Sequence, residues 1–185
     1  YENPSNPYEE GDRVQLDDST VLGLSYECHV KLSGEVFVYV HKSHDDAWTF
    51  ERPKAAPIYF PEDLRIPPSV LRGEEKWGRV TYRPGRWVAY IWFSRAPIQL
   101  SNGDVLAAAW CYFKDDSKYR VIVIKSTDRG ESWTYLSTVA YDPQVAGDNG
   151  FCEPSLTWLP NGDLLCMMRT GSGFPLYQSR STDQG

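Results

Sequence analysis

The feature that most constrains this chain is that it repeats itself. Residues 100–106 (LSNGDVL) resemble residues 159–165 (LPNGDLL), and residues 32–36 (LSGEV) form a weaker copy. Each copy places a polar Gly turn between two apolar runs. Asn and Gly both tolerate the positive φ angles of a type I′ turn, so these segments predict β-hairpins.

A second pattern recurs at the end of a predicted strand. The apolar run 120–125 leads into Ser126-Thr127-Asp128-Arg129-Gly130-Glu131-Ser132-Trp133, and residues 181–185 (STDQG) begin the same pattern again. An eroded copy, residues 43–48 (SHDDAW), follows the predicted strand 36–40. It keeps the Ser, Asp and Trp but lacks the Gly and two residues of length.

The pattern Ser-x-Asp-x-Gly-x-x-Trp has the chemistry of a hairpin staple. The Ser and Asp oxygens can accept hydrogen bonds from backbone N–H groups of the turn. The Gly takes the left-handed position, and the Trp folds back to bury a large apolar surface on the sheet. We therefore interpret Asp128 and Asp183 as structural residues rather than catalytic ones.

Composition supports an all-β protein and removes several functions. Aromatic residues make up 14% of the 185 residues, and the chain contains 14 Gly and 13 Pro, which favours short strands and many turns. The formal net charge of −6 argues against a nucleic-acid groove or an anionic membrane surface. No apolar run approaches the ~20 residues of a membrane span. The four Cys and three His show no ligand spacing, so we expect neither a metal nor a cofactor.

The staple resembles the Asp box, or BNR repeat, of the sialidase superfamily. Residues 153–185 and 95–133 match that repeat in the same order, whereas the first half of the chain does so only around residues 30–50. The resemblance implies an all-β, sialidase-like six-bladed β-propeller, of which residues 1–185 would hold about three blades. We expect these blades at 14–52, 87–140 and 150–185, with the Pro-rich stretch 53–86 as an insertion or long loop.

Three blades leave two open sheet edges, which ring closure normally removes. Either the chain is part of a longer polypeptide or another chain completes the ring; we favour the first, because residue 185 falls inside a repeat. The sequence leaves the compartment open, with a secreted, periplasmic or cell-surface protein as the expectation.

The resemblance also implies chemistry. Sialidases cleave terminal sialic acids through a Tyr nucleophile, a Glu that activates it, an Asp acid/base and three Arg that bind the substrate carboxylate. Glu153 begins the segment that is similar to the one carrying the activating Glu, and Arg169 lies where one carboxylate-binding Arg would fall. The other reading of this pair is an ordinary ion pair at the end of a blade.

Two segments resemble the Arg-Ile-Pro signature of the first Arg. Arg95-Ala96-Pro97 precedes a hairpin, as expected, whereas Arg65-Ile66-Pro67 carries the full triplet without one. Asp115 and Asp116 lie in the following loop, where the acid/base Asp would fall, although the ordinary loop composition around them favours a solvated acidic turn. In sialidases the first Arg and the activating Glu lie several blades apart, yet Arg95 and Glu153 fall in adjacent ones. Either one assignment is wrong, or the pocket is rearranged for a different sugar.

These observations predict a sialidase-type glycoside hydrolase that releases a terminal sugar, acidic sugars included, from a glycan or small substrate. The alternative is a non-catalytic propeller that binds glycan or protein, and a third reading is a repeat protein assembled with a partner chain. An enzyme should gather several Arg and at least two carboxylic acids around one site, whereas a binding module should show an aromatic platform.

Overall fold

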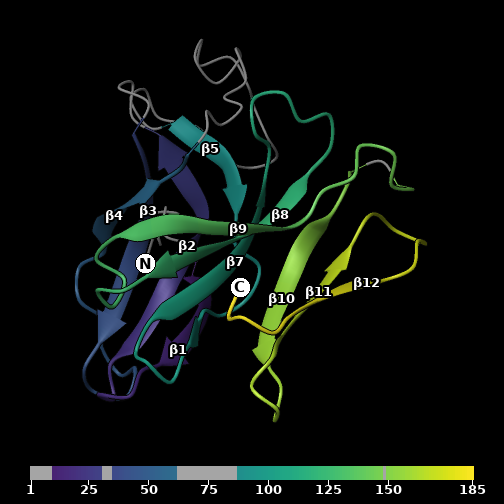
Figure 1. Cartoon of the computed structure of the whole chain (residues 1–185). Coiled ribbons are helices and arrows are strands. Elements are labelled where there is room, and N and C mark those ends of the chain that lie inside the picture. Colours follow the sequence, from purple (N-terminus) through teal and green to yellow (C-terminus); the bar gives the residue numbers. More distant parts are fainter. Residues whose placement is uncertain (1–9, 31–34, 62–86, 148) are drawn as a thin grey trace.

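The computed structural model describes residues 10–30, 35–61, 87–147 and 149–185, and this part of the chain is all-β (Figure 1). Its strands form three antiparallel units in chain order. Unit 1 contains β1 (Glu10–Gln15), β2 (Val21–Val30), β3 (Val36–Ser43) and β4 (Lys54–Tyr59). Unit 2 contains β5 (Trp87–Trp92), β6 (Ile98–Gln99), β7 (Val105–Cys111), β8 (Arg120–Ser126) and β9 (Trp133–Ala140). Unit 3 contains β10 (Cys152–Trp158), β11 (Leu164–Arg169) and β12 (Tyr177–Ser181).

Units 1 and 2 pair with each other at two places and form one closed sheet, with β1 paired to β2 outside the ring. Strand β4 pairs in parallel with β9, and β2 pairs antiparallel with β5. The result is a ring of seven strands in the order β2-β3-β4-β9-β8-β7-β5, which Figure 1 shows to the left of unit 3. The sequence predicted separate blades and gave no sign of these two pairings. They satisfy backbone groups that open edges would leave unpaired.

Alternation along β8 shows how the chain builds two cores. Ile122 and Ile124 point into the closed sheet, while Val121 and Val123 point towards unit 3, as the two-residue period of a strand requires. Strand β7 is buried over its whole length, because it lies between both cores. Its three alanines face both cores: Ala107 and Ala109 belong to the core of the closed sheet, and Ala108 belongs to the core facing unit 3.

The stretch 53–86 begins with a strand rather than a loop, because β4 pairs with β3 and completes unit 1. Residues 62–86 lie outside the described part of the chain, as does the weak hairpin copy at 32–34. In that described part, no helix is long and apolar enough to cross a membrane.

The hairpins predicted at 100–106 and 159–165 are present, but their turn type differs from the expectation. Within these two turns, positive φ occurs only at Gly103 (91°) and Gly162 (88°). Each of these glycines donates its N–H to the carbonyl three residues earlier. Asn102 and Asn161 instead accept a bond from the N–H two residues on. These are type I turns followed by a left-handed Gly, so the type I′ prediction was wrong.

The three Asp boxes share one hydrogen-bond scheme. Ser126 donates to Asp128 at 2.7 Å and accepts from the N–H of Gly130 at 2.7 Å, and the same bonds recur at Ser181. The first box was read as shortened, which was wrong. Ala47 donates to Ser43 in the place of the Gly, at φ 66°, and Thr49 bonds Asp45 as Ser132 bonds Asp128.

Counting from those shared bonds, Phe50 takes the position of Trp133, and Trp48 falls one residue after the left-handed position. Trp48 is 87% exposed, whereas Trp133 is fully buried in the core of the closed sheet. The sequence pattern paired Trp48 with Trp133 because they are the same residue type. The turn hydrogen bonds pair Trp133 with Phe50 instead.

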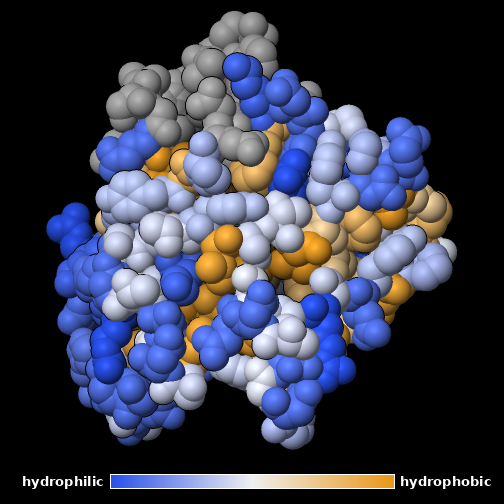
Figure 2. Space-filling model, viewed as in Figure 1, coloured by the Kyte–Doolittle hydropathy of each residue, from blue (hydrophilic) through white to orange (hydrophobic). Residues whose placement is uncertain are grey.

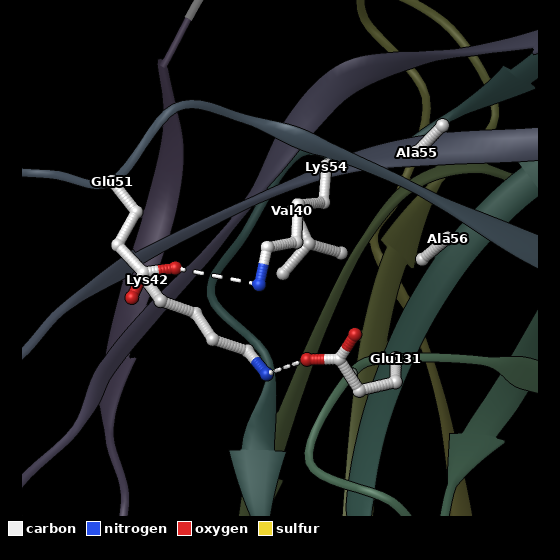
Figure 3. Close-up of a pocket in the computed structure, with 8 residues that line it drawn as sticks. Val40, Lys42, Glu51, Lys54, Ala55, Ala56 and Glu131 are labelled. Atoms are coloured by element: carbon white, nitrogen blue, oxygen red, sulfur yellow. Dashed lines mark hydrogen bonds and ion pairs between the residues drawn. The ribbon is translucent and has the colours of Figure 1, made fainter.

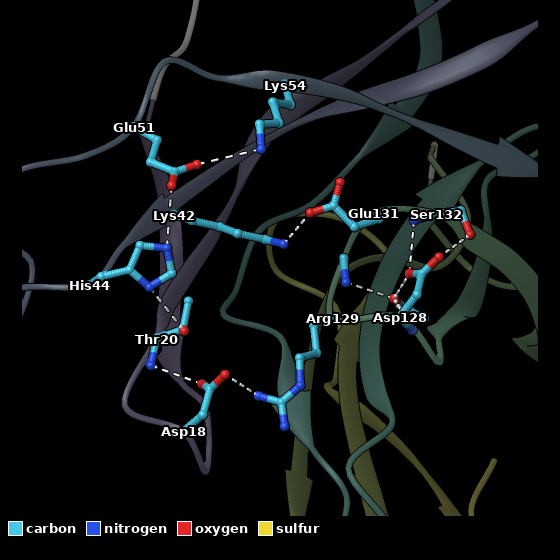
Figure 4. Close-up of polar contacts among 12 residues, drawn as sticks. Asp18, Thr20, Lys42, His44, Glu51, Lys54, Asp128, Arg129, Glu131 and Ser132 are labelled. Atoms are coloured by element: carbon cyan, nitrogen blue, oxygen red, sulfur yellow. Dashed lines mark hydrogen bonds and ion pairs between the residues drawn. The ribbon is translucent and has the colours of Figure 1, made fainter.

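The first two boxes are tied together by charge at one end of the closed sheet (Figure 4). Lys42 pairs with Glu131 at 2.5 Å, and Arg129 pairs with Asp17 at 3.0 Å and with Asp18. A small hollow beside these pairs is lined by Val40, Lys42, Glu51, Lys54 and Glu131, among others (Figure 3). Both carboxylates that line this hollow are paired with lysines, Glu131 with Lys42 and Glu51 with Lys54. We therefore interpret the hollow as part of the packing between the first two boxes.

Candidate functional site

Glu153 occupies an unusual backbone position at the start of β10. The register of β10 against β11 shifts between Cys152 and Ser155, which marks a β-bulge, and Glu153 takes a φ of 50° inside it. In the described part of the chain, the other non-Gly residues with positive φ lie in turns or Asp boxes. A non-Gly residue held left-handed inside a strand costs of the order of 1–3 kcal/mol, and such strain concentrates at functional sites.

The bulge aims the Glu153 carboxylate at Arg169, the last residue of β11. Arg169 Nε donates to Oε2 at 2.5 Å and Nη2 donates to Oε1, so the guanidinium forms a two-pronged contact with the carboxylate. The two side chains are 44% and 33% exposed and thus open to solvent. These hydrogen bonds hold the pKa of Glu153 below its usual value against the opposing effect of partial burial.

Units 1 and 2 contribute to the same cluster. Arg95, which follows β5, lies close enough to Glu153 to lower its pKa further, and its Nη1 is 3.8 Å from Oδ2 of Asp12 on β1. The hydroxyl of the neighbouring Ser94 donates to the carbonyl of Pro154 at 3.0 Å, which links units 2 and 3. The sequence analysis considered Glu153 and Arg169 as a pair and treated Arg95 and Glu153 as conflicting assignments; the structure places Arg95 near the Glu153–Arg169 pair.

Asp12 and Tyr26 were missed by the sequence analysis. Tyr26 on β2 is an electrostatic neighbour of Arg169 and packs edge-on against Trp110. Neither residue lies in a repeat motif, so only the closure of the sheet could have placed them beside unit 3. We call Asp12, Tyr26, Arg95, Glu153 and Arg169 the Glu153 cluster.

Asp115 and Asp116 lie in a different hollow. Arg120 donates to both carboxylate oxygens of Asp116, at 2.9 and 2.7 Å, and the N–H of Phe113 donates to one of them. Burial raises the pKa of Asp116, but these hydrogen bonds outweigh it and leave the pKa below its ordinary value. Asp115 is exposed and lines the hollow together with Pro61, Lys114 and Tyr141. Arg65, the third predicted arginine, lies outside the described residues.

A further groove runs between the closed sheet and unit 3. Figure 2 shows hydrophobic surface in the middle of this face. The apolar lining of the groove comes from Val123, Val139, Leu156, Leu164 and Cys166, and the third Asp box closes one end. It carries no titratable pair comparable to Glu153 and Arg169.

Solved glycoside hydrolases share this fold. A microbial sialidase, described as Hadza microbial sialidase Hz136, superposes with a TM-score of 0.58 at 15% identity, covering 95% of this chain and 32% of that one. The α-L-arabinanase of Penicillium chrysogenum, solved with arabinobiose, gives 0.56 at 18% identity, covering 98% and 49%. These similarities show an all-β fold of the propeller type found in glycoside hydrolases.

The sequence itself then places the chain. Residues 14–185 match the BNR repeat-like domain, and the chain belongs to this family. A protein of unknown function from Dyadobacter fermentans shares 25% identity and a TM-score of 0.63, covering 94% of this chain and 47% of that one. The chain thus spans about half the length of the Dyadobacter protein and of the arabinanase, and about a third of the length of the sialidase. No curated protein matches the sequence.

Proposed function

We propose that this chain forms part of a sialidase-like glycoside hydrolase that releases a terminal sugar from a glycan, with the Glu153 cluster at its active site. The observation that carries the proposal is the left-handed bulge at Glu153, which points an ionised carboxylate at Arg169 and Arg95. Local turn chemistry explains the carboxylates of the Asp boxes, but it does not explain this one.

The contact with Arg169 and the lowered pKa favour one role for Glu153. Because Arg169 and Arg95 favour the ionised form, they also weaken Glu153 as a base, so its carboxylate is suited to orient a nucleophile by a hydrogen bond and to stabilise positive charge at the anomeric carbon. It is poorly suited to donate a proton at neutral pH. Arg95 and Arg169 supply hydrogen-bond donors for the bound sugar.

A proton donor is needed for the leaving group, and Asp115 is the better of the two predicted candidates. Asp116 already accepts three hydrogen bonds from Arg120 and Phe113, and these bonds hold it in the ionised form, so it is poorly suited to donate a proton. Asp115 is exposed in the loop after β7. Its participation requires that the substrate reach from the Glu153 cluster to that loop.

The test is turnover by the Glu153→Gln variant on the best aryl glycoside. We expect a loss of at least ~100-fold, the usual scale for a positioned acid/base group. Glu131→Gln is the matched control, because it removes one carboxylate that also pairs with a cation, at the Asp-box end. Equal turnover in the two variants, with both folded, would remove Glu153 from the mechanism.

The alternative function is a non-catalytic propeller that binds a glycan. The two-pronged pair supports its non-catalytic part, since a carboxylate held by Arg169 can be a structural link between β10 and β11. Glycan binding by the unaltered protein without any bond cleavage would establish this alternative.

A further inference from the structure

The Glu153 cluster contains two arginines and two carboxylates, so its positive and negative charges are equal in number. Each of its two guanidinium groups has a carboxylate near it: Arg169 hydrogen-bonds Glu153, and Arg95 lies 3.8 Å from Asp12 and close enough to Glu153 to lower its pKa. The pairs come from three different units, so the balance is a property of the assembled site and not of one turn. The described cluster therefore carries no net formal charge.

Such a site is unfavourable for an anionic sugar. A substrate carboxylate can use Arg169 only by displacing the two hydrogen bonds from Glu153, and it would then lie beside an unpaired carboxylate. At Arg95 it would meet Asp12, whose side chain is 53% exposed and open to the same solvent. Repulsion from two carboxylates offsets the attraction of two guanidinium groups.

A neutral sugar has the complementary chemistry. Its hydroxyl groups can donate to Asp12 and Glu153 and accept from Arg95 and Arg169 without breaking either pair. The partly exposed side chain of Tyr26, 36% accessible, adds an apolar surface at the edge of the cluster, where a sugar face can pack. We propose that the Glu153 cluster binds a neutral terminal sugar and selects against sugars that carry a carboxylate, an inference that rests on the proposed function.

The first experiment compares aryl glycosides of neutral pentoses and hexoses with an aryl sialoside and an aryl glucuronide. We expect kcat/KM for the best neutral substrate to exceed that for either acidic one by at least ~100-fold, since two facing carboxylates oppose the substrate charge. Glu153-dependent cleavage of an acidic glycoside in preference to the neutral ones overturns this inference and leaves the proposed function standing. Failure to cleave any glycoside overturns the proposed function itself.

The second experiment alters the balance directly. Asp12→Asn releases Arg95 from its carboxylate, so we expect the ratio of acidic to neutral kcat/KM to rise about tenfold, as the loss of one nearby charge implies. Glu131→Gln removes the same charge from a side chain of nearly equal exposure, 54%, and should leave the ratio unchanged. A similar rise in both variants would show a bulk-charge effect and overturn the inference, as would no rise in Asp12→Asn.

Asp12→Asn also requires a control for structural damage, because Asp12 belongs to strand β1. Asp12→Glu retains the charge and should restore the selectivity of the unaltered protein. Loss of selectivity in Asp12→Glu together with an unchanged melting temperature would contradict the charge argument, because the carboxylate would still be present.

Discussion

Among the described residues, the Asp116–Arg120 and Glu153–Arg169 pairs have similar hydrogen bonds but different surroundings. Asp116 and Arg120 lie four residues apart beside one turn, with side chains 5% and 20% exposed, and the guanidinium packs between the rings of Phe113 and Tyr141. Glu153 and Arg169 come from two strands, are open to solvent, and require a strained backbone. Hydrogen-bond geometry alone therefore does not identify a site; exposure and backbone strain distinguish the buried pair from the pair that we propose as functional.

The largest expected effect lies at the exposed pair. Arg169→Ala should lower turnover by at least ~100-fold, equivalent to about 2.7 kcal/mol, because Glu153 loses its positioning contact. The pKa of Glu153 should also rise, since the hydrogen bonds from Arg169 are the main cause that lowers it. The acidic limb of the pH–rate profile should therefore move to higher pH. An unmoved acidic limb would exclude ionised Glu153 as the group that titrates in the reaction.

The buried pair should respond in stability. Asp116→Asn removes the charged acceptor of the Arg120 and Phe113 hydrogen bonds, and we expect the free energy of unfolding to fall by about 2 kcal/mol. Urea denaturation measures this directly. A change below about 0.5 kcal/mol would place this pair among ordinary surface ion pairs and would remove the contrast with Glu153.

That loss should depend on pH with a known sign. The pKa of folded Asp116 lies below the ordinary value of 3.8, so the unfolded chain binds the proton more readily. The contribution of Asp116 is present in full above about pH 4 to 5 and is lost as the pH falls through the folded pKa. The difference in the free energy of unfolding between Asp116→Asn and the unaltered protein should thus shrink below pH 3.8.

The smallest effect is expected at the Asp-box end. Glu131 is 54% exposed, and its pair with Lys42 should contribute no more than about 1 kcal/mol to stability. Glu131→Gln should leave the melting temperature nearly unchanged in high salt, where the unaltered pair is screened as well. A large destabilisation would show that the charged links in Figure 4 hold units 1 and 2 together.

The sequence by itself determined the features that depend on neighbouring residues. The strands at 36–40 and 120–125, the two hairpins and the three Asp boxes could all be predicted, because two-residue alternation and turn hydrogen bonds act over a few positions. Even there, the exposure of Trp48 and the type I turns differed from expectation, since both depend on the φ angles of single residues.

Only the tertiary structure decided how the units meet. The pairings of β4 with β9 and of β2 with β5 join segments distant in sequence, and no local pattern encodes which open edge finds which partner. The Glu153 cluster is a product of that assembly: Asp12 and Tyr26 enter from unit 1, and the bulge turns Glu153 towards Arg169. Residue types named the candidates, but their charge balance exists only because three units converge.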